Sequence, residues 1–159
     1  VSASAEFNIW GDPEGARVAL TSGVKNVTLV PLDATHRALV SQDDCDRFKA
    51  LGTPAGMAAD VFIGRRVRAH DDAPQPLVRP HTSPVHDALA VLAVVDPSLL
   101  KNVYHCYVDV ETFGEVTVGR TVCDIYGRSR KEPNCNVALD ADEAKFVAML
   151  TETLGRTAK

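Results

Sequence analysis

The chain has 159 residues, of which 45% are hydrophobic and 24% are charged. This composition suffices for a hydrophobic core and is too ordinary for a disordered or fibrous protein. The formal net charge is -4 without a long run of Lys or Arg, which argues against a nucleic-acid-binding surface. The longest apolar run, Ala88 to Val95, is far too short to cross a bilayer, so we expect no membrane partner.

The first half of the chain alternates helix and strand patterns. Asp12-Pro13 predicts a helix through Thr21, and the Val, Thr and Leu residues of 26–32 predict a buried strand. Further helices are predicted over 42–51, where Ser41 is the cap, and from Pro54 to about Ile63. This βαβ alternation indicates a layered α/β protein, with helices flanking a sheet.

Residues 65–84 differ in composition from what precedes them. They contain clustered arginines, an Asp-Asp pair, four prolines and two histidines, His70 and His81, with few apolar anchors. Such a segment predicts a long surface loop, and long loops in compact enzymes often act as active-site lids. The plainer alternative is a connection without a role, in which both histidines are solvated.

The second half predicts a helix over 86–95, a hairpin of 104–112 with 115–122, and a short strand at 137–139. A final amphipathic helix should begin at Asp140 as its cap and run to about Leu154. No internal repeat and no second domain is evident in the sequence.

The cysteines are scattered at Cys45, Cys106, Cys123 and Cys135, without a Cys-x-x-Cys pair. This spacing is typical neither of a disulfide framework nor of a zinc site. His105 and Cys106 fall in an alternating run that favours the two faces of a strand over a metal site.

Two short segments carry side chains suited to chemistry. Residues 84–91 read PVHDALAV, so His86 and Asp87 stand in the first turn of an apolar helix, where unpaired N–H groups favour an anion. The alternative is that Asp87 only caps this helix and His86 is a surface residue. Residues 5–14 read AEFNIWGDPE, with a carboxylate and an amide two positions apart. Those two side chains could instead close a turn before the helix at Asp12.

Together with VPLDATH over residues 30–36, these two segments resemble the nucleoside hydrolase family in order and spacing, over nearly the whole chain. The resemblance implies a nucleoside hydrolase-like α/β fold with a Rossmann-like core, of which residues 1–159 are the carboxyl-terminal part of a single domain. The family's aspartate cluster, Asp-x-Asp-x-Gly-x-Asp-Asp, which supplies most calcium ligands, is not present here. The pairs at 43–44 and 71–72 lack the surrounding pattern.

The resemblance also implies roles for individual residues. Asp87 matches a Ca²⁺ ligand, Glu6 and Asn8 match residues that hydrogen-bond the ribose hydroxyls, and His86 matches the acid that protonates the leaving base. His36 is interpreted as structural. Histidine rather than tryptophan before the metal aspartate resembles the less selective branch, which accepts inosine and uridine.

The implied function is calcium-dependent hydrolysis of the N-glycosidic bond of purine and pyrimidine ribonucleosides, carried out by the complete enzyme. The family further implies a cytoplasmic homo-oligomer, a dimer or tetramer, and we expect this part of it to be inactive alone. Two alternatives stay open: a non-catalytic nucleoside- or sugar-binding module, and a purely structural α/β piece. An Asp-rich motif in the preceding sequence of the parent gene would favour the enzyme.

Overall fold

The computed structural model describes residues 2–72 and 79–156. The chain forms two compact units. The first unit comprises Val1–Pro31 and Val103–Ala138, and the second comprises Leu32–Asn102 and Leu139–Lys159. Across the described residues, no helix combines the length and the apolar character needed to cross a membrane.

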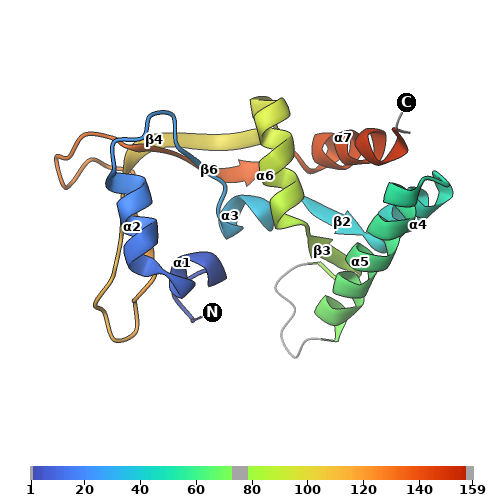
Figure 1. Ribbon diagram of the computed structural model, residues 1–159, viewed down its shortest axis with the longest axis horizontal. Helices are drawn as coiled ribbons and strands as arrows, with labels where there is room; N and C mark the ends of the chain where they lie inside the picture. The colour runs from blue at the N-terminus through green and yellow to red at the C-terminus, as the bar shows by residue number, and fades with distance from the viewer. Residues whose placement is uncertain (1, 73–78, 157–159) are drawn as a thin grey trace. The chain divides into compact units, whose positions relative to one another are not determined.

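The first unit combines two short helices with most of a four-stranded sheet (Figure 1). The strands follow the order β1-β6-β4-β5. The elements are α1 (Phe7–Gly11), α2 (Pro13–Thr21), β1 (Thr28–Leu29), β4 (Leu100–Val110), β5 (Thr121–Asp124) and β6 (Cys135–Ala141). β1 pairs in parallel with β6 at Thr28 and Asn136, and β4 pairs antiparallel with β5 at Val110 and Thr121.

Side-chain hydrogen bonds fix the ends of these elements. α2 begins as predicted, because the Asp12 carboxylate accepts from the Gly15 N–H at 2.9 Å and Pro13 occupies the first turn. Asn134 joins α2 to the sheet, since its amide donates to the carbonyl of Leu20 at 3.0 Å and accepts from the Val108 N–H at 2.7 Å. The core beneath includes Val108 and other alternating apolar residues of β4.

Two predictions for this unit are wrong in their bounds. The strand predicted over 26–32 is two residues long and not buried, because Asn26 has a φ of 60° and Leu32 already begins a helix. The predicted hairpin pairs as expected, but its second strand starts at Thr121. Residues 115–119 form turns instead, closed by the Gly119 N–H donating to the Glu111 carbonyl at 2.7 Å.

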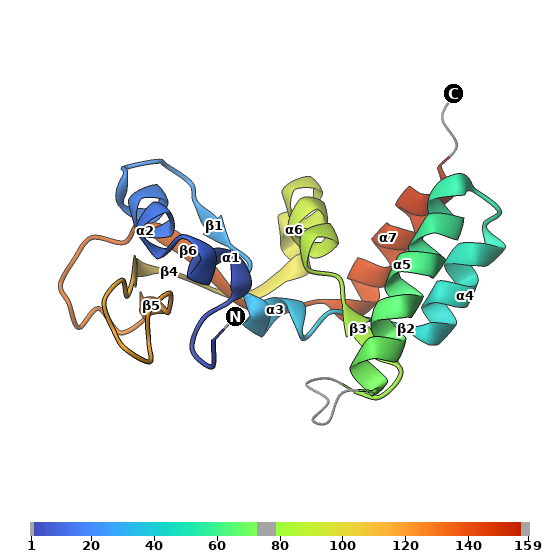
Figure 2. The same ribbon diagram turned by 60° about the horizontal axis from the view of Figure 1, so that its bottom comes forward.

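The second unit is mainly helical, with α4, α5 and α7 packed against one another (Figure 2). Its elements are α3 (Leu32–Thr35), β2 (Leu39–Ser41), α4 (Gln42–Ala50), α5 (Pro54–Asp71), β3 (Thr82–Pro84), α6 (His86–Val95), the 3₁₀ helix η1 (Pro97–Leu99) and α7 (Glu143–Gly155). Phe48, Leu89, Leu99 and Phe146 are among its fully buried side chains. α4 starts at Ser41, as predicted, through a reciprocal capping box with Asp44.

α5 continues well past the predicted end at Ile63. Ile63 and Val67, four residues apart, are both buried and give this stretch one apolar face, while Arg65 and Arg66 point to solvent. The loop predicted over 65–84 is therefore wrong at both ends, where the chain is helix and strand. Residues 73–78 lie outside the described part, and the lid role stays a prediction.

The last helix, α7, also begins later than predicted. Its cap is Asp142, whose carboxylate accepts from the Lys145 N–H at 3.1 Å. Asp140, the predicted cap, is a residue of β6. Capping requires the residue directly before the first helical turn, and the strand occupies the chain through Ala141.

Candidate active site

Glu6 and Asn8, the predicted ribose-binding pair, lie together at the start of α1 in the first unit. The Glu6 carboxylate accepts from the backbone N–H of Asn8 at 2.8 Å and of Ile9 at 3.3 Å, and the Asn8 side-chain amide donates to it at 3.3 Å. Glu6 thus closes a helical turn, which was the structural alternative. A carboxylate has about four acceptor positions, so capacity for a ribose hydroxyl remains.

The loop between β4 and β5 supports this turn. The Ser4 hydroxyl donates to the Val116 carbonyl at 2.9 Å. Gly119 has a φ of +82°, and a Cβ there would lie 2.9 Å from the Cα of Trp10 and 3.0 Å from the Cβ of Ala5. Only glycine allows this backbone conformation together with so close an approach. The loop therefore fixes the segment that carries Glu6 and Asn8.

His86 is the first residue of α6 in the second unit, and its ring contacts the end of α3. Its Nδ1 lies 2.8 Å from the hydroxyl oxygen of Thr35, which is 2% exposed. Its ring centroid lies 5.7 Å from that of His36, with the planes tilted by 47°. His86 is partly exposed, and its ring also packs against two residues of the 30–36 motif, Thr35 and His36.

His36 contributes an uncharged ring to this cluster near neutral pH. Burial lowers the pKa of His36, and the nearby His70 lowers it further, while Asp33 opposes both effects. His81, in contrast, faces α5: its Nδ1 pairs with the Asp71 carboxylate at 2.8 Å, and its backbone N–H donates to the same group at 2.6 Å. The backbone hydrogen bond from His81 is the main cause that lowers the pKa of Asp71.

Asp87 is exposed in the first turn of α6. It is not the cap: that position is held by Val85, without a side-chain capping bond. The carboxylate therefore remains available as an oxygen ligand for a hard cation such as Ca²⁺. Over residues 2–72 and 79–156, however, no three or more His, Cys, Asp or Glu side chains gather as a metal site. Asp87 therefore does not form a complete metal site with the described residues.

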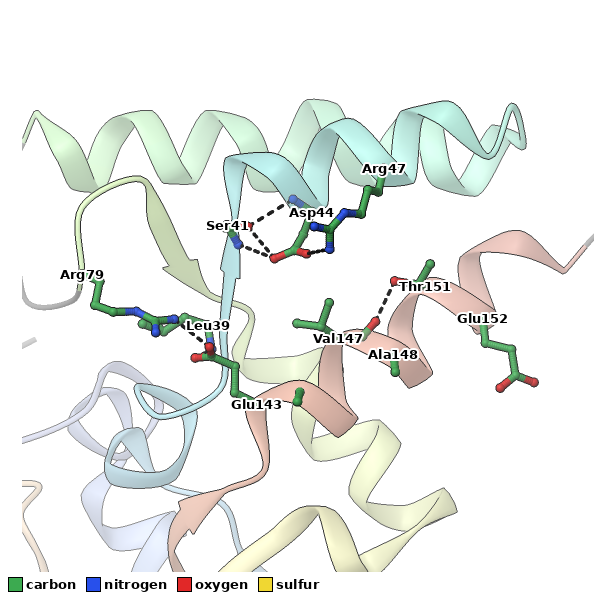
Figure 3. A pocket seen from close by; sticks show the side chains of 11 residues that line it. Leu39, Ser41, Asp44, Arg47, Arg79, Glu143, Val147, Ala148, Thr151 and Glu152 are labelled. Carbon is green, nitrogen blue, oxygen red and sulfur yellow. Dashed lines mark hydrogen bonds and ion pairs between the residues drawn. The ribbon is translucent and has the colours of Figure 1, made fainter.

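A separate open groove of about 740 Å³ lies in the second unit between β2, α4 and α7 (Figure 3). Two ion pairs lie in it, Arg79 with Glu143 at 2.7 Å and Arg47 with Asp44 at 3.0 Å. Glu143 also accepts from the backbone N–H of Leu39 at 3.1 Å. The groove contains none of the predicted site residues, and Glu143 links α7 to Arg79 and to the backbone of Leu39.

The four predicted site residues thus form two local pairs, Glu6 with Asn8 in the first unit and His86 with Asp87 in the second. Thr35 was not predicted as part of the site. Its signal in the sequence is the 30–36 motif, but the motif alone does not show which side chain its hydroxyl contacts.

Comparisons with known proteins all match this chain to nucleoside hydrolases. The family model described as inosine-uridine preferring nucleoside hydrolase matches residues 1–148. The pyrimidine-specific ribonucleoside hydrolase RihA of Salmonella newport (strain SL254) is 35% identical over 151 residues, which cover 95% of this chain and 47% of that protein. The chain thus spans about half the length of the curated relatives it matches.

Solved structures are similar in fold. The purine-preferring ribonucleoside hydrolase from Gardnerella vaginalis superposes with a TM-score of 0.81 at 27% identity, over 96% of this chain and 46% of that one. A plant nucleoside hydrolase gives a TM-score of 0.85 at 24% identity, over 97% of this chain and 48% of that one, a likeness of fold alone. The α/β fold class predicted from the sequence is confirmed.

Proposed function

Because this chain belongs to the inosine-uridine preferring nucleoside hydrolase family, we propose that it serves the hydrolysis of ribonucleosides to free base and ribose in the complete enzyme. The observation that carries this proposal is the extent of the family match. Residues 1–148 include both the Glu6 and Asn8 pair and the His86 and Asp87 pair. The order of these motifs supports the chain as the carboxyl-terminal part of a single such domain.

Each pair suits one requirement of the reaction. Cleavage of the N-glycosidic bond leaves positive charge on the sugar and negative charge on the base, so the enzyme must hold the sugar and protonate the base. Glu6 and Asn8 offer a carboxylate acceptor and an amide, which suit neighbouring hydroxyls. His86 serves as the acid, because an imidazole is the side chain best suited to proton donation near neutral pH. Its Nε2 is the donor, because Nδ1 faces Thr35.

Asp87 contributes one ligand to a calcium site. When bound there, a calcium ion would supply coordination of sugar hydroxyls and activation of a water molecule. Such an ion takes about six to eight oxygen ligands, and Asp87 is one. This chain alone should therefore neither bind calcium tightly nor hydrolyse nucleosides.

The proposed substrates are both purine and pyrimidine ribonucleosides. His86 precedes Asp87 as in the less selective branch, and the relatives include proteins described as pyrimidine-specific and as purine-preferring. We also propose a cytoplasmic homo-oligomer, dimer or tetramer. The net charge of -4 supports the expectation of no nucleic-acid partner.

The test uses the full-length protein that contains this chain, with Asp87→Asn and the control Asp43→Asn. Asp43 is also an exposed aspartate in the first turn of a helix. Hydrolysis of inosine, guanosine, uridine and cytidine is measured with and without a calcium chelator, and calcium binding is measured by calorimetric titration. We expect chelation to abolish hydrolysis, and Asp87→Asn to weaken calcium binding and turnover by at least about tenfold while the control changes neither.

Three results would contradict parts of this proposal. Unchanged calcium affinity in Asp87→Asn would remove Asp87 from the ligand set. Nucleoside binding without hydrolysis by the full-length protein would favour the non-catalytic binding module. Turnover of inosine by the isolated 159-residue chain at the full-length rate would show that the described residues complete the site.

A further inference from the structure

We propose that Thr35 is a positioning residue that holds the His86 imidazole in the orientation needed to donate a proton to the leaving base. This inference rests on the proposed function, in which His86 is that acid. The observation behind it is the 2.8 Å contact between Thr35 Oγ1 and His86 Nδ1, made by residues 51 positions apart in the chain.

Strand pairing creates this contact. β2 and β3 pair antiparallel, with Leu39 opposite Pro84. Thr35 lies four residues before Leu39, and His86 lies two residues after Pro84. The pairing of this two-stranded sheet therefore brings the end of α3 beside the start of α6.

The surroundings of Thr35 make its hydroxyl a fixed partner. Thr35 is 2% exposed, and its neighbour Ala34 is completely buried. The α3 turn is closed by the His36 N–H, which donates to the Leu32 carbonyl at 2.9 Å. The Thr35 hydroxyl lies 3.4 Å from that same carbonyl, a longer and weaker contact than the one with His86. A β-branched side chain is restricted at χ1, so the Thr35 oxygen has few positions available.

The His36 ring also packs against the His86 imidazole and restricts its movement. The His36 and His86 centroids are 5.7 Å apart. The hydrogen bond between Thr35 Oγ1 and His86 Nδ1 fixes the rotation of the ring about its Cβ–Cγ bond. The two contacts together keep Nε2 in one orientation, toward the leaving base. A small displacement of a catalytic group lowers the reaction rate strongly.

The experiment compares Thr35→Val, Thr35→Ser, His86→Ala and the double variant His86→Ala with Thr35→Val in the full-length enzyme. Thr53→Val is the matched control. Thr53 is also buried, and its hydroxyl donates to the Leu154 carbonyl at 2.6 Å and accepts from the Gly56 N–H. Each protein is assayed on inosine and on p-nitrophenyl riboside, whose leaving group departs without protonation, and its melting temperature is recorded.

We expect Thr35→Val to lower kcat on inosine about tenfold, with KM changed less than about twofold and little loss on the activated riboside. Thr35→Ser should restore kcat, because it keeps the hydroxyl. His86→Ala should lower kcat on inosine by about 10²-fold or more, and Thr35→Val should add little to it. Thr53→Val should lower the melting temperature without changing the ratio of the two substrates.

Equal losses on both substrates in Thr35→Val, or no rescue by Thr35→Ser, would overturn the positioning role while leaving the acid role of His86 intact. Equal losses on both substrates in His86→Ala would instead overturn the acid role, and the inference about Thr35 with it. If Thr35→Val does not fold, Thr35→Cys replaces it, because a thiol of similar size is a weak hydrogen-bonding group, and the same selective loss is expected.

Discussion

The Glu6 carboxylate has a structural role, the capping of α1, and a proposed functional role, the binding of ribose. It caps α1 through the N–H groups of Asn8 and Ile9, and it accepts from the Asn8 side chain. The bond between the two side chains also orients the Asn8 amide. The turn-closing interpretation and the ribose-binding interpretation therefore do not exclude each other, and an experiment must separate capping from substrate binding.

Replacing Glu6 by alanine should separate them when it is compared with Asp12→Ala. Asp12 caps the next helix in the same way, through the Gly15 N–H. Both changes should lower stability by about 1 kcal/mol, the usual cost of losing a cap. Only Glu6→Ala should also lower kcat/KM, by about tenfold or more and by a similar factor for every nucleoside. Steady-state kinetics on several bases checks this. A loss confined to one base would contradict a ribose contact.

At the scale of elements, local polar signals predict the starts of α2 and α4 correctly, but they place the start of α7 two residues too early and the end of α5 eight residues too early. Asp12 and Ser41 both cap helices at the positions that the sequence predicts. α5 extends beyond its predicted end at Ile63, because the polar composition after Ile63 predicts a loop although Val67 continues the buried face of the helix. Polar residues on the solvent face of a helix look the same in sequence as polar residues of a loop.

Gly119 offers a test of how the β4–β5 loop supports α1. Gly119→Ala should destabilise more than the control Gly127→Ala. Both glycines have positive φ, but a Cβ at Gly127 meets nothing within 4 Å, whereas one at Gly119 meets the backbone of Trp10. The difference should be about 1–3 kcal/mol, the cost of forcing a methyl group into a packed site. Chemical denaturation measures the free energy of unfolding of both variants. Equal decreases in the two variants would show that the loop accommodates the methyl group without strain.

At the scale of the whole molecule, each unit has its own buried core, and charged side chains connect elements within a unit. In the second unit, Asp96 ends α6 and caps η1, and its carboxylate pairs with Lys145 of α7 at 2.6 Å. Hydrogen bonds from Lys145 and then from Ser98 lower the pKa of Asp96 to about 2. This group links three elements through one ionised side chain.

The lowered pKa of Asp96 predicts a pH-dependent contribution to stability. The folded pKa lies below the unfolded value of about 3.9, so the contribution is fully present above pH 4 or so and is lost as the pH falls towards 2. Asp96→Asn should therefore lower the melting temperature at pH 7. The difference in melting temperature between this variant and the unmodified protein should become smaller below about pH 4. Lys145→Gln should reproduce this trend. A gap that stays constant down to the lowest pH at which the protein folds would refute the assignment.

The sequence by itself determined the α/β class and the starts of helices whose caps are local, such as α2 and α4. A capping residue such as Ser41 forms hydrogen bonds with groups no more than three residues away, so the local sequence is enough to predict it. The tertiary structure alone decided which side chains meet across the chain. The Thr35 to His86 contact depends on the register of β2 with β3, and the glycine at 119 is required because a distant helix backbone approaches it. These contacts depend on how segments far apart in the sequence pack together, which the order of residues around either partner does not reveal.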